Sequence, residues 1–486
     1  MGGGLLQLVI VGQQDSYLSE NPSISYFKYA YKKHTNFSMD SIQLTFNTNP
    51  VFDPNINNAS YLCKIGRYGD LLDKLYFCFT LPDIYSSDLH RFRWISNIGN
   101  NIIKKATISV GGTIIDTITN DWLNIWNELV NGNDDDNYNL MLGNVDELTE
   151  PSIVGEKRVS IVNNRFVYNY YPTSDINNLN AKPSINSRNI IVPLKFWFTK
   201  NPALALPLLR LQYSEIFLNI ELENCEKLYT IYSKELEKYI SSQYFNELYV
   251  QNNDFPNITK NININTFCRN NNIFPYIEAN FIFLAQEERN KLFLIPKLTY
   301  LVEQLDITST KSIPSDTEAT TLININNHKP TKEILWITRR DDYYTKFNMF
   351  NNYTASINEN KSEGILDKAA IIWNNTNTRV EFKNADFYNI LQPYQHHSNI
   401  PKQGIYCYSF ALHPEKFNPS GYYNASLVST KLQVNIKNKY NNDLLNNKLN
   451  KYFHNKNYNF DYLVNVYSLS YNVFEIVGGS SGLKFA

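Results

Sequence analysis

Short patterns typical of β-strands recur along both halves of the chain, and turn residues separate them. Ser41–Phe46 alternates polar and apolar residues with a period of two, as a strand with one buried face does. Ala106–Val110 and Thr113–Ile115 are joined by Gly111 and Gly112, which predict a two-residue hairpin because glycine adopts positive φ readily. Further strands are expected at Leu71–Leu81, Tyr276–Leu284, Thr331–Ile337, Gly404–Leu412, Thr430–Ile436 and Leu463–Phe474. These patterns predict an all-β fold.

Length and composition fit two large β units. The chain has 486 residues, and a single β domain often reaches about 200 residues. Aromatic residues make up 14% of the chain, with 35 Tyr and 28 Phe, and such side chains suit pleated, half-buried surfaces. No pattern repeats with a fixed period of about 20–50 residues, which argues against a solenoid or a propeller.

One amphipathic helix is expected in the first half of the chain. Its apolar residues recur at helical spacing, and they are Trp122, Ile125, Trp126 and Leu129. Asn120 or Asp121 can cap its start, and Gly132 follows its end. We expect this helix to pack on the end of a sheet rather than to present its tryptophans as a ligand platform. A second, short helix is expected over Lys234–Tyr239.

Changes in composition divide the chain into five segments. They are an N-terminal arm at 1–24, a first β unit at 25–224, a connecting insertion at 225–272, a second β unit at 273–476 and a C-terminal tail at 477–486. The arm is expected to dock on another surface, such as a neighbouring subunit, because Leu5–Val11 is mostly apolar. Gly478–Gly482 is expected to be flexible, and the Asn- and Lys-rich stretch at 437–457 to be a surface loop.

Charge and cysteine content argue against several classes of function. The net charge is -1, from 45 basic and 46 acidic residues, so direct nucleic-acid binding is not expected, because it needs clustered Lys and Arg. The cysteines are dispersed, without a CxxC zinc pattern, and fit a reducing compartment; they are Cys63, Cys78, Cys225, Cys268 and Cys407. No run approaches the roughly 20 apolar residues of a membrane span, and the N-terminus lacks the features of a signal peptide.

No complete catalytic or cofactor-binding motif is present. His396 and His397 are adjacent, but they lack the HExxH or HxH spacing of a metal site. Asp134–Asp136 lacks the alternating ligands of a calcium loop, so a solvated loop is expected there, with weak calcium binding as the alternative. The glycine clusters do not fit a phosphate-binding loop, and there is no GxSxG motif. We therefore expect no enzyme activity, no metal and no cofactor.

Seven Asn-x-Ser/Thr sequons are the remaining candidate sites, as positions for glycosylation. They are Asn36, Asn58, Asn257, Asn352, Asn360, Asn374 and Asn424. Many sequons arise by chance in an Asn-rich chain. Without a signal peptide, glycosylation by a host secretory pathway is not expected.

An apolar block in the middle of the chain carries the most informative resemblance. Ile190–Leu209 reads as a strand, a turn at Asn201-Pro202 and an apolar stretch that prolines keep from becoming a helix. With several other blocks it resembles the major capsid proteins of large nucleocytoplasmic DNA viruses. In chain order, the other blocks are Gly2–Leu8, Phe27–Phe37, Arg67–Leu71, Asp121–Leu129, Asn327–Trp336, Gln392–His397, Gly404–Leu412 and Pro419–Gly421. With Tyr471–Val473 near the end, they span essentially the whole chain in the family's order.

The resemblance implies a double jelly roll, in which one chain forms two eight-stranded antiparallel sandwiches with short helices in the loops. It implies a structural major capsid protein whose homotrimers form pseudo-hexagonal capsomers, and these tile the icosahedral shell of a large double-stranded DNA virus. The implied partners are further copies of the chain, minor capsid proteins and an inner membrane at the capsomer base. The implied location is the outer capsid shell of a virion that is assembled in the host-cell cytoplasm.

Two other functions are compatible with the residues. A carbohydrate-binding or carbohydrate-active jelly-roll protein would use aromatic residues for sugar stacking. It would gather exposed aromatics and carboxylates in one groove, whereas the sequence spreads them throughout. A minor capsid paralogue, such as a vertex or fibre-associated protein, would be distinguished by its abundance in the virion.

Overall fold

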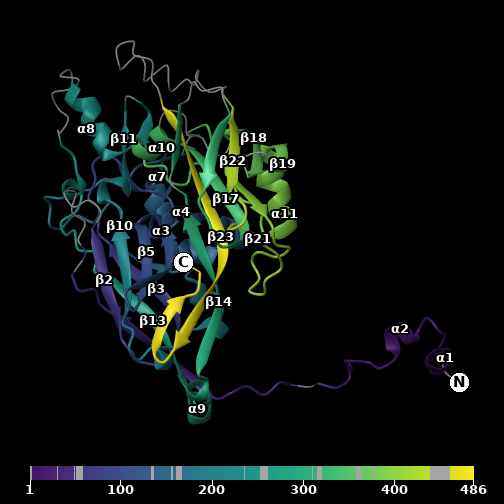
Figure 1. Cartoon of the computed structure of the whole chain (residues 1–486). Coiled ribbons are helices and arrows are strands. Elements are labelled where there is room, and N and C mark those ends of the chain that lie inside the picture. The colour runs from purple at the N-terminus through teal and green to yellow at the C-terminus, as the bar shows by residue number, and fades with distance from the viewer. Residues whose placement is uncertain are drawn as a thin grey trace.

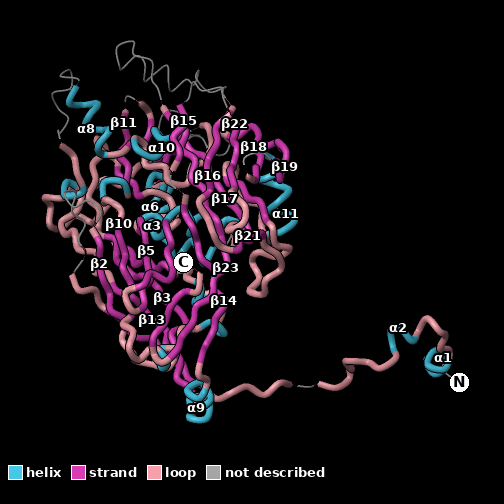
Figure 2. Tube along the Cα trace, viewed as in Figure 1, coloured by secondary structure: helices cyan, strands magenta, loops and turns pink. Residues whose placement is uncertain are grey.

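A computed structural model of the chain describes most of its residues. The described ranges are 3–29, 31–48, 50, 59–132, 136–154, 157–159, 167–234, 236–251, 261–308, 310–314, 320–356, 364–374, 377–437 and 460–485. Strands make up the body of the molecule, and short helices lie in the connections between them (Figure 2). The Asn- and Lys-rich stretch at 437–457 lies, apart from residue 437, outside the described residues.

The first half of the chain forms a sandwich of two four-stranded antiparallel sheets, which we call the first roll (Figure 1). One sheet has the order β1 (Phe37–Leu44), β13 (Tyr276–Leu284), β3 (Leu71–Leu81) and β9 (Arg188–Pro193). The other has the order β2 (Ser60–Ile65), β10 (Ile216–Leu222), β5 (Ile103–Val110) and β6 (Thr113–Thr119). Every second residue of β10 is buried, because one face of the strand covers the core between the sheets.

The second half forms a similar sandwich, the second roll. Its larger sheet has the central order β14 (Lys297–Ile307), β23 (Asp461–Val477), β17 (Pro330–Arg340) and β20 (Ile405–Ser409). Three short strands join it, β15 (Lys311–Pro314) and β24 (Ser480–Leu483) on β23 and β21 (Tyr423–Asn424) on β17. The facing sheet has the order β16 (Thr321–Ile325), β22 (Thr430–Ile436), β18 (Leu366–Trp373) and β19 (Asn377–Asn384).

The two rolls share one topology. When the eight main strands of each roll are numbered along the chain, their spatial orders are 1-8-3-6 in one sheet and 2-7-4-5 in the other, in both halves. Consecutive strands therefore alternate between facing sheets, except for the fourth and fifth, which form a hairpin in one sheet, as in a jelly roll. The predicted double jelly roll is confirmed.

Strand pairing places the boundary between the rolls later than the composition predicts. The sequence assigns β13 to the second unit, which it begins at residue 273, but β13 pairs with β1 and β3 of the first roll. The last strand of a jelly roll lies between its first and third strands, so the chain must return to the first sheet after a long connection. That connection is also part of the first half, because β11 (Tyr229–Ser233) pairs with β4 (Phe92–Trp94).

Two local expectations are wrong. The described residues of Lys234–Tyr239 are not helical, because they lie in the hairpin between β11 and β12 (Lys238–Ile240), where Glu237 has a positive φ of 53°. The tail after residue 477 is paired with the sheet: Gly478 and Gly479 turn the chain, with φ of 59° and 87°, and β24 then lies along the end of β23. Both segments find hydrogen-bond partners that a local pattern does not reveal.

The predicted helix of the first half is confirmed as α4 (Asn120–Val130). Its cap is Thr119 rather than Asn120 or Asp121, and the Thr119 hydroxyl accepts a hydrogen bond from the Trp122 backbone N–H at 3.4 Å. Among the described residues, the other α-helices are α1 (Gly3–Val9), α2 (Ser16–Ser19), α3 (Ile98–Asn101), α5 (Asp136–Leu142), α6 (Asp146–Thr149), α7 (Pro151–Val154), α8 (Ser242–Gln251), α9 (Gln286–Leu294), α10 (Asp341–Thr345) and α11 (Gln392–His396).

The larger sheet of the second roll is covered on both faces. Ile334 and Trp336 of β17 point into the core of their own roll, whereas Leu335 and Ile337 belong to the core shared with the first roll. Nearly all of β17 is therefore buried. The first roll supplies α4 to this contact, since the Trp122 ring lies 6.3 Å from the ring of Tyr467 on β23. We call this contact between the two rolls the seam.

Candidate functional site: the seam between the two rolls

A buried ion pair crosses the seam at the start of α4. The Arg339 guanidinium of β17 donates two hydrogen bonds to the Asp121 carboxylate, at 3.0 and 3.1 Å. The same carboxylate accepts further hydrogen bonds from Asn465 at 3.2 Å and from the Tyr467 hydroxyl at 3.0 Å. Burial alone would lower the pKa of Arg339, but the Asp121 charge raises it above its ordinary value. This cluster fixes the orientation of one roll on the other.

A second charged cluster lies further along the seam. Glu303 of β14 accepts a hydrogen bond from Lys200 of the first roll at 2.7 Å and is also paired with Lys332 of β17. The Lys332 side chain is fully buried. Burial raises the pKa of Glu303, but the two lysine charges outweigh it and hold that pKa below its ordinary value. The cluster thus ties the Ile190–Leu209 block, through Lys200, to the second roll.

His397 is at the centre of a third buried cluster, entirely within the second roll. Its two ring nitrogens lie 3.0 Å from a Glu333 oxygen and 3.1 Å from a Glu415 oxygen. Burial lowers the pKa of His397, but the Glu333 charge and hydrogen bonds to Cys407, Glu333 and Glu415 outweigh it and raise the pKa well above its ordinary value. The protonated imidazole is therefore a structural cation between two carboxylates. His396, its neighbour, faces the Leu412 carbonyl instead.

Asp116 on β6 is a buried carboxylate in unfavourable surroundings. It is buried, and the backbone N–H groups of Trp197 and Thr117 donate to it at 3.0 and 2.8 Å. Burial raises the pKa of Asp116 to about 7, although these hydrogen bonds and Lys200 act in the opposite direction. The folded state therefore binds this proton more tightly than the unfolded chain does.

Asp116→Asn is expected to remove a loss of stability on going from pH 5 to pH 7. A folded-state pKa above the unfolded value of about 3.9 means that stability falls as pH rises between the two, by about 2 kcal/mol from pH 5 to pH 7. Urea titrations at pH 5, 6 and 7 measure this slope in both proteins. The exposed Asp88 provides the control, as Asp88→Asn should keep the wild-type slope. Parallel curves for wild type and Asp116→Asn would contradict the assignment.

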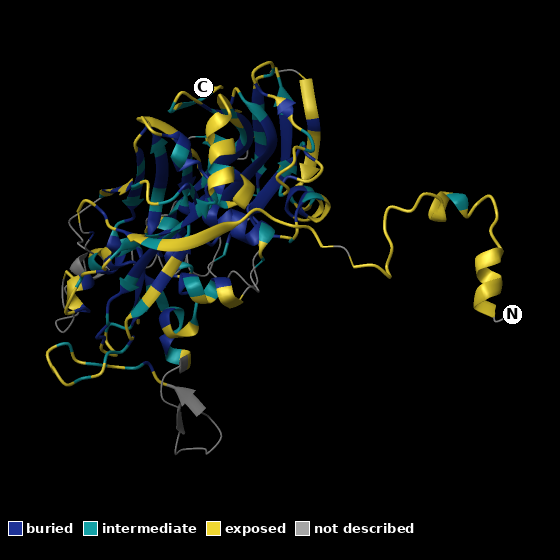
Figure 3. Cartoon of the chain, turned by 90° about the horizontal axis from the view of Figure 1, so that it is seen from below, coloured by how far each residue is buried: buried dark blue, intermediate teal, exposed yellow. Residues whose placement is uncertain are grey.

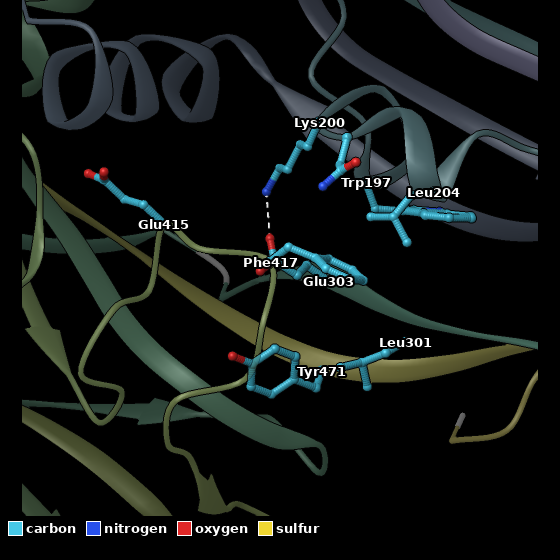
Figure 4. Close-up of a pocket in the computed structure, with 9 residues that line it drawn as sticks. Trp197, Lys200, Leu204, Leu301, Glu303, Glu415, Phe417 and Tyr471 are labelled. Carbon is cyan, nitrogen blue, oxygen red and sulfur yellow. Dashed lines mark hydrogen bonds and ion pairs between the residues drawn. The ribbon is translucent and has the colours of Figure 1, made fainter. Parts of the chain in front are cut away.

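A pocket opens between the rolls beside the Lys200–Glu303 pair (Figure 4). Trp197, Lys200 and Leu204 line it from the first roll, and the second roll contributes Leu301, Glu303, Glu415, Phe417 and Tyr471. It encloses about 170 Å³. Aromatic rings and carboxylates that are far apart in the sequence thus gather in one place, whereas the sequence shows them only as dispersed.

The structure separates the candidate residues of the sequence. Asn36, Asn374 and Asn424 are exposed. Asn352 is 1% exposed, and its side-chain amide donates to the Ser356 carbonyl at 2.9 Å, so the folded chain leaves no room for a glycan there. Asn58, Asn257 and Asn360 lie outside the described residues, as do Asp134 and Asp135. Among the residues that the structure describes, no group of three or more His, Cys, Asp or Glu is arranged to hold a metal ion.

The N-terminal arm extends away from the body (Figure 3). Its large apolar side chains are exposed: Leu8 is 76%, Leu18 is 90% and Phe27 is 100% exposed. The described residues upstream of β1 are almost all exposed, and the arm reaches the body beside α9, where the Ala285 N–H donates to the Asn36 carbonyl at 3.3 Å. In the described part of the chain, no helix is long and apolar enough to cross a membrane. All five cysteines are buried, and none of them forms a disulfide bond.

Sequence reasoning missed the seam. In the sequence, Asp121 is a possible helix cap and the first residue of a block shared with the family, and Arg339 follows the predicted strand Thr331–Ile337. A usable signal existed, because Lys332 and Glu333 interrupt an apolar strand pattern, and charged residues inside such a pattern must be paired when buried. The pattern cannot name the partner, since Lys332 meets Glu303, 29 residues away, and Arg339 meets Asp121, 218 residues away.

Comparisons with known proteins agree with this architecture. The family described as "Major capsid protein N-terminus" matches residues 25–260, and the family described as "Large eukaryotic DNA virus major capsid protein" matches residues 288–482. The chain is 28% identical to the major capsid protein of Phaeocystis pouchetii virus and 28% identical to that of Pyramimonas orientalis virus, over 100% of both chains in each case.

A solved structure supports the fold independently. A chain in the quasi-atomic structure of the PBCV-1 virus capsid superposes with a TM-score of 0.66 at 24% identity, over 95% of this chain and 100% of that chain. The two rolls share one topology, the two family matches follow each other along the chain, and the relatives match over their full length. The protein therefore belongs to the family of major capsid proteins of large nucleocytoplasmic DNA viruses, which are structural proteins and not enzymes.

Proposed function

We propose that the chain forms homotrimers, and that these are the pseudo-hexagonal capsomers of an icosahedral shell around a large double-stranded DNA virus. The observation that carries this proposal is the repeated strand order 1-8-3-6 and 2-7-4-5. Two rolls of the same topology in one chain, repeated by a threefold axis, give six similar units around that axis. A block with six similar sides packs into a hexagonal facet.

Charge and rigidity favour such an assembly. The net charge of -1 leaves little repulsion between identical blocks, and heterologous contacts between identical blocks generate extended lattices. The buried Asp121–Arg339 pair holds the two rolls as one unit, which keeps the angles between capsomer sides constant. In this proposal the chain is part of the outer shell of the virion and is assembled in the host-cell cytoplasm.

The arm gives the proposed capsomer its further partners. Its exposed apolar residues, among them Leu5, Leu8 and Leu18, have no cover in the single chain, and burying them on a neighbour is favourable. We assign residues 1–24 to contacts between capsomers or with minor capsid proteins. The inner membrane is a separate partner in this proposal, and it lies beneath the base of the capsomer.

Light scattering after size exclusion tests both parts of the proposal. The full chain and a variant without residues 1–24 are expected to have three times the mass of the 56.5 kDa chain, and only the full chain should form a lattice with its minor capsid proteins. A stable monomer of the full chain would overturn the trimer. Loss of the trimer in the truncated variant would overturn the role of the arm, because the arm would then belong to the capsomer itself.

A further inference from the structure

The pocket at the seam has the chemistry of a ligand site. Trp197 is 2% exposed and lines the pocket, yet its indole N–H has no hydrogen-bond partner among the described residues. This nitrogen is itself fully buried, so other atoms of Trp197 line the pocket. With about 170 Å³, the pocket has room for far more than the one water that fits in about 10–15 Å³.

The charges that line the pocket are already balanced. Two lysines are paired with Glu303, and the His397 cation lies between two glutamates, so three cations face three carboxylates; they are Lys200, Lys332 and His397, and Glu303, Glu333 and Glu415. A charged ligand would add an unpaired charge to this half-buried site, which is unfavourable. The pocket therefore selects a ligand without net charge.

The polar groups also disfavour a purely apolar ligand. Three charged groups border the pocket, namely Glu303, Glu415 and the Lys200 ammonium. A purely apolar ligand would displace the water around these groups and could not replace the hydrogen bonds that the water makes to them. A suitable ligand must donate to carboxylates, accept from an ammonium and still cover apolar surface.

Aromatic faces supply that apolar surface. Phe417 is 41% exposed at the pocket, Tyr471 lies deeper, and Leu301 lies beside Tyr471 (Figure 4). A pyranose ring carries hydroxyl groups around its edge and C–H groups on its faces, so it meets both requirements at once. We propose that the seam pocket binds one neutral pyranose residue of a glycan, a function that goes beyond that of a capsid subunit.

Binding of methyl pyranosides to the full-length chain tests this proposal by saturation-transfer NMR and calorimetry. At least one neutral methyl pyranoside is expected to bind saturably, whereas glucuronate and glucosamine should bind more weakly. Phe417→Ala, which removes a stacking face, and Leu204→Trp, which fills the pocket, should each weaken binding by about tenfold or more. Phe382→Ala is the matched control, because Phe382 is 45% exposed on β19 and does not line the pocket.

Three results would overturn the proposal. The first is that no pyranoside binds saturably. The second is that Phe382→Ala and Phe417→Ala lose sugar affinity equally. The third is that p-cresol binds in a way that depends on Phe417 while no sugar binds. The last result would mark the pocket as a site for an aromatic side chain of another protein. Light scattering on the same samples keeps the two questions apart, since a trimer that binds no sugar refutes the pocket alone, and a monomer that binds sugar refutes the capsomer alone.

Discussion

Asp121→Ala is expected to lower the free energy of unfolding by about 3–5 kcal/mol, because it leaves the Arg339 charge buried without its partner. The two side chains are 9% and 8% exposed, and the pair has two parallel hydrogen bonds. Asn465 and Tyr467 would lose their acceptor as well. The midpoint of urea unfolding measures the effect, and an unchanged midpoint would show that solvent reaches this pair.

Two further variants show that the loss comes from the unpaired charge. In Asp121→Ala/Arg339→Met both charges are gone, so the loss should be smaller than in Asp121→Ala alone. Glu215→Ala removes one partner of the exposed pair with Lys64, whose side chains are 59% and 54% exposed. Such a surface pair contributes about 0–1 kcal/mol, so this control should unfold almost as the wild type does.

Trp122→Ala is expected to cost about 3–5 kcal/mol, the usual range for removing a large aromatic side chain from a core. Trp122 is 2% exposed and lies between Trp126, at 5.4 Å between ring centroids, and Tyr467 of the second roll, at 6.3 Å. The variant removes packing from both sides of the seam, so the two rolls should lose stability together. Thermal unfolding followed by near-ultraviolet circular dichroism measures the shift.

The matched control for this prediction is an aromatic side chain on a helix that lies at the surface. Tyr394 on α11 is 75% exposed, so Tyr394→Ala should change stability little, by less than about 0.5 kcal/mol. A melting temperature of Trp122→Ala equal to that of Tyr394→Ala would contradict the buried position of α4.

Local patterns predicted individual elements well. The bounds of β3, β13 and β22 coincide with the segments expected from strand patterns, and the hairpin at Gly111-Gly112 is present between β5 and β6. These features depend on residues that are neighbours in the chain, namely on alternation with a period of two and on glycines that accept positive φ. The resemblance to a family extended the prediction from single strands to a double jelly roll.

Pairing between distant segments limited what the sequence could reveal. β1 pairs with β13, so Phe37 lies opposite Leu284, and no local pattern could assign β13 to the first roll rather than the second. The same applies to the C-terminal tail, whose glycines read as a flexible end although β24 pairs with β23. In each case the deciding hydrogen bonds join residues that the chain brings together only on folding.

The sequence by itself determined three things. The chain is built of short strands, one helix interrupts them at a position that the pattern locates, and the chain is similar to one family. The tertiary structure alone decided how the two rolls are joined. The charged residues of the seam are of types that usually lie at the surface, and only the packing of the two rolls buries them against each other. They are Asp121 with Arg339, and Lys200 and Lys332 with Glu303. Burial turns such charges into specific pairs, because a charge removed from water must find its partner within hydrogen-bond distance.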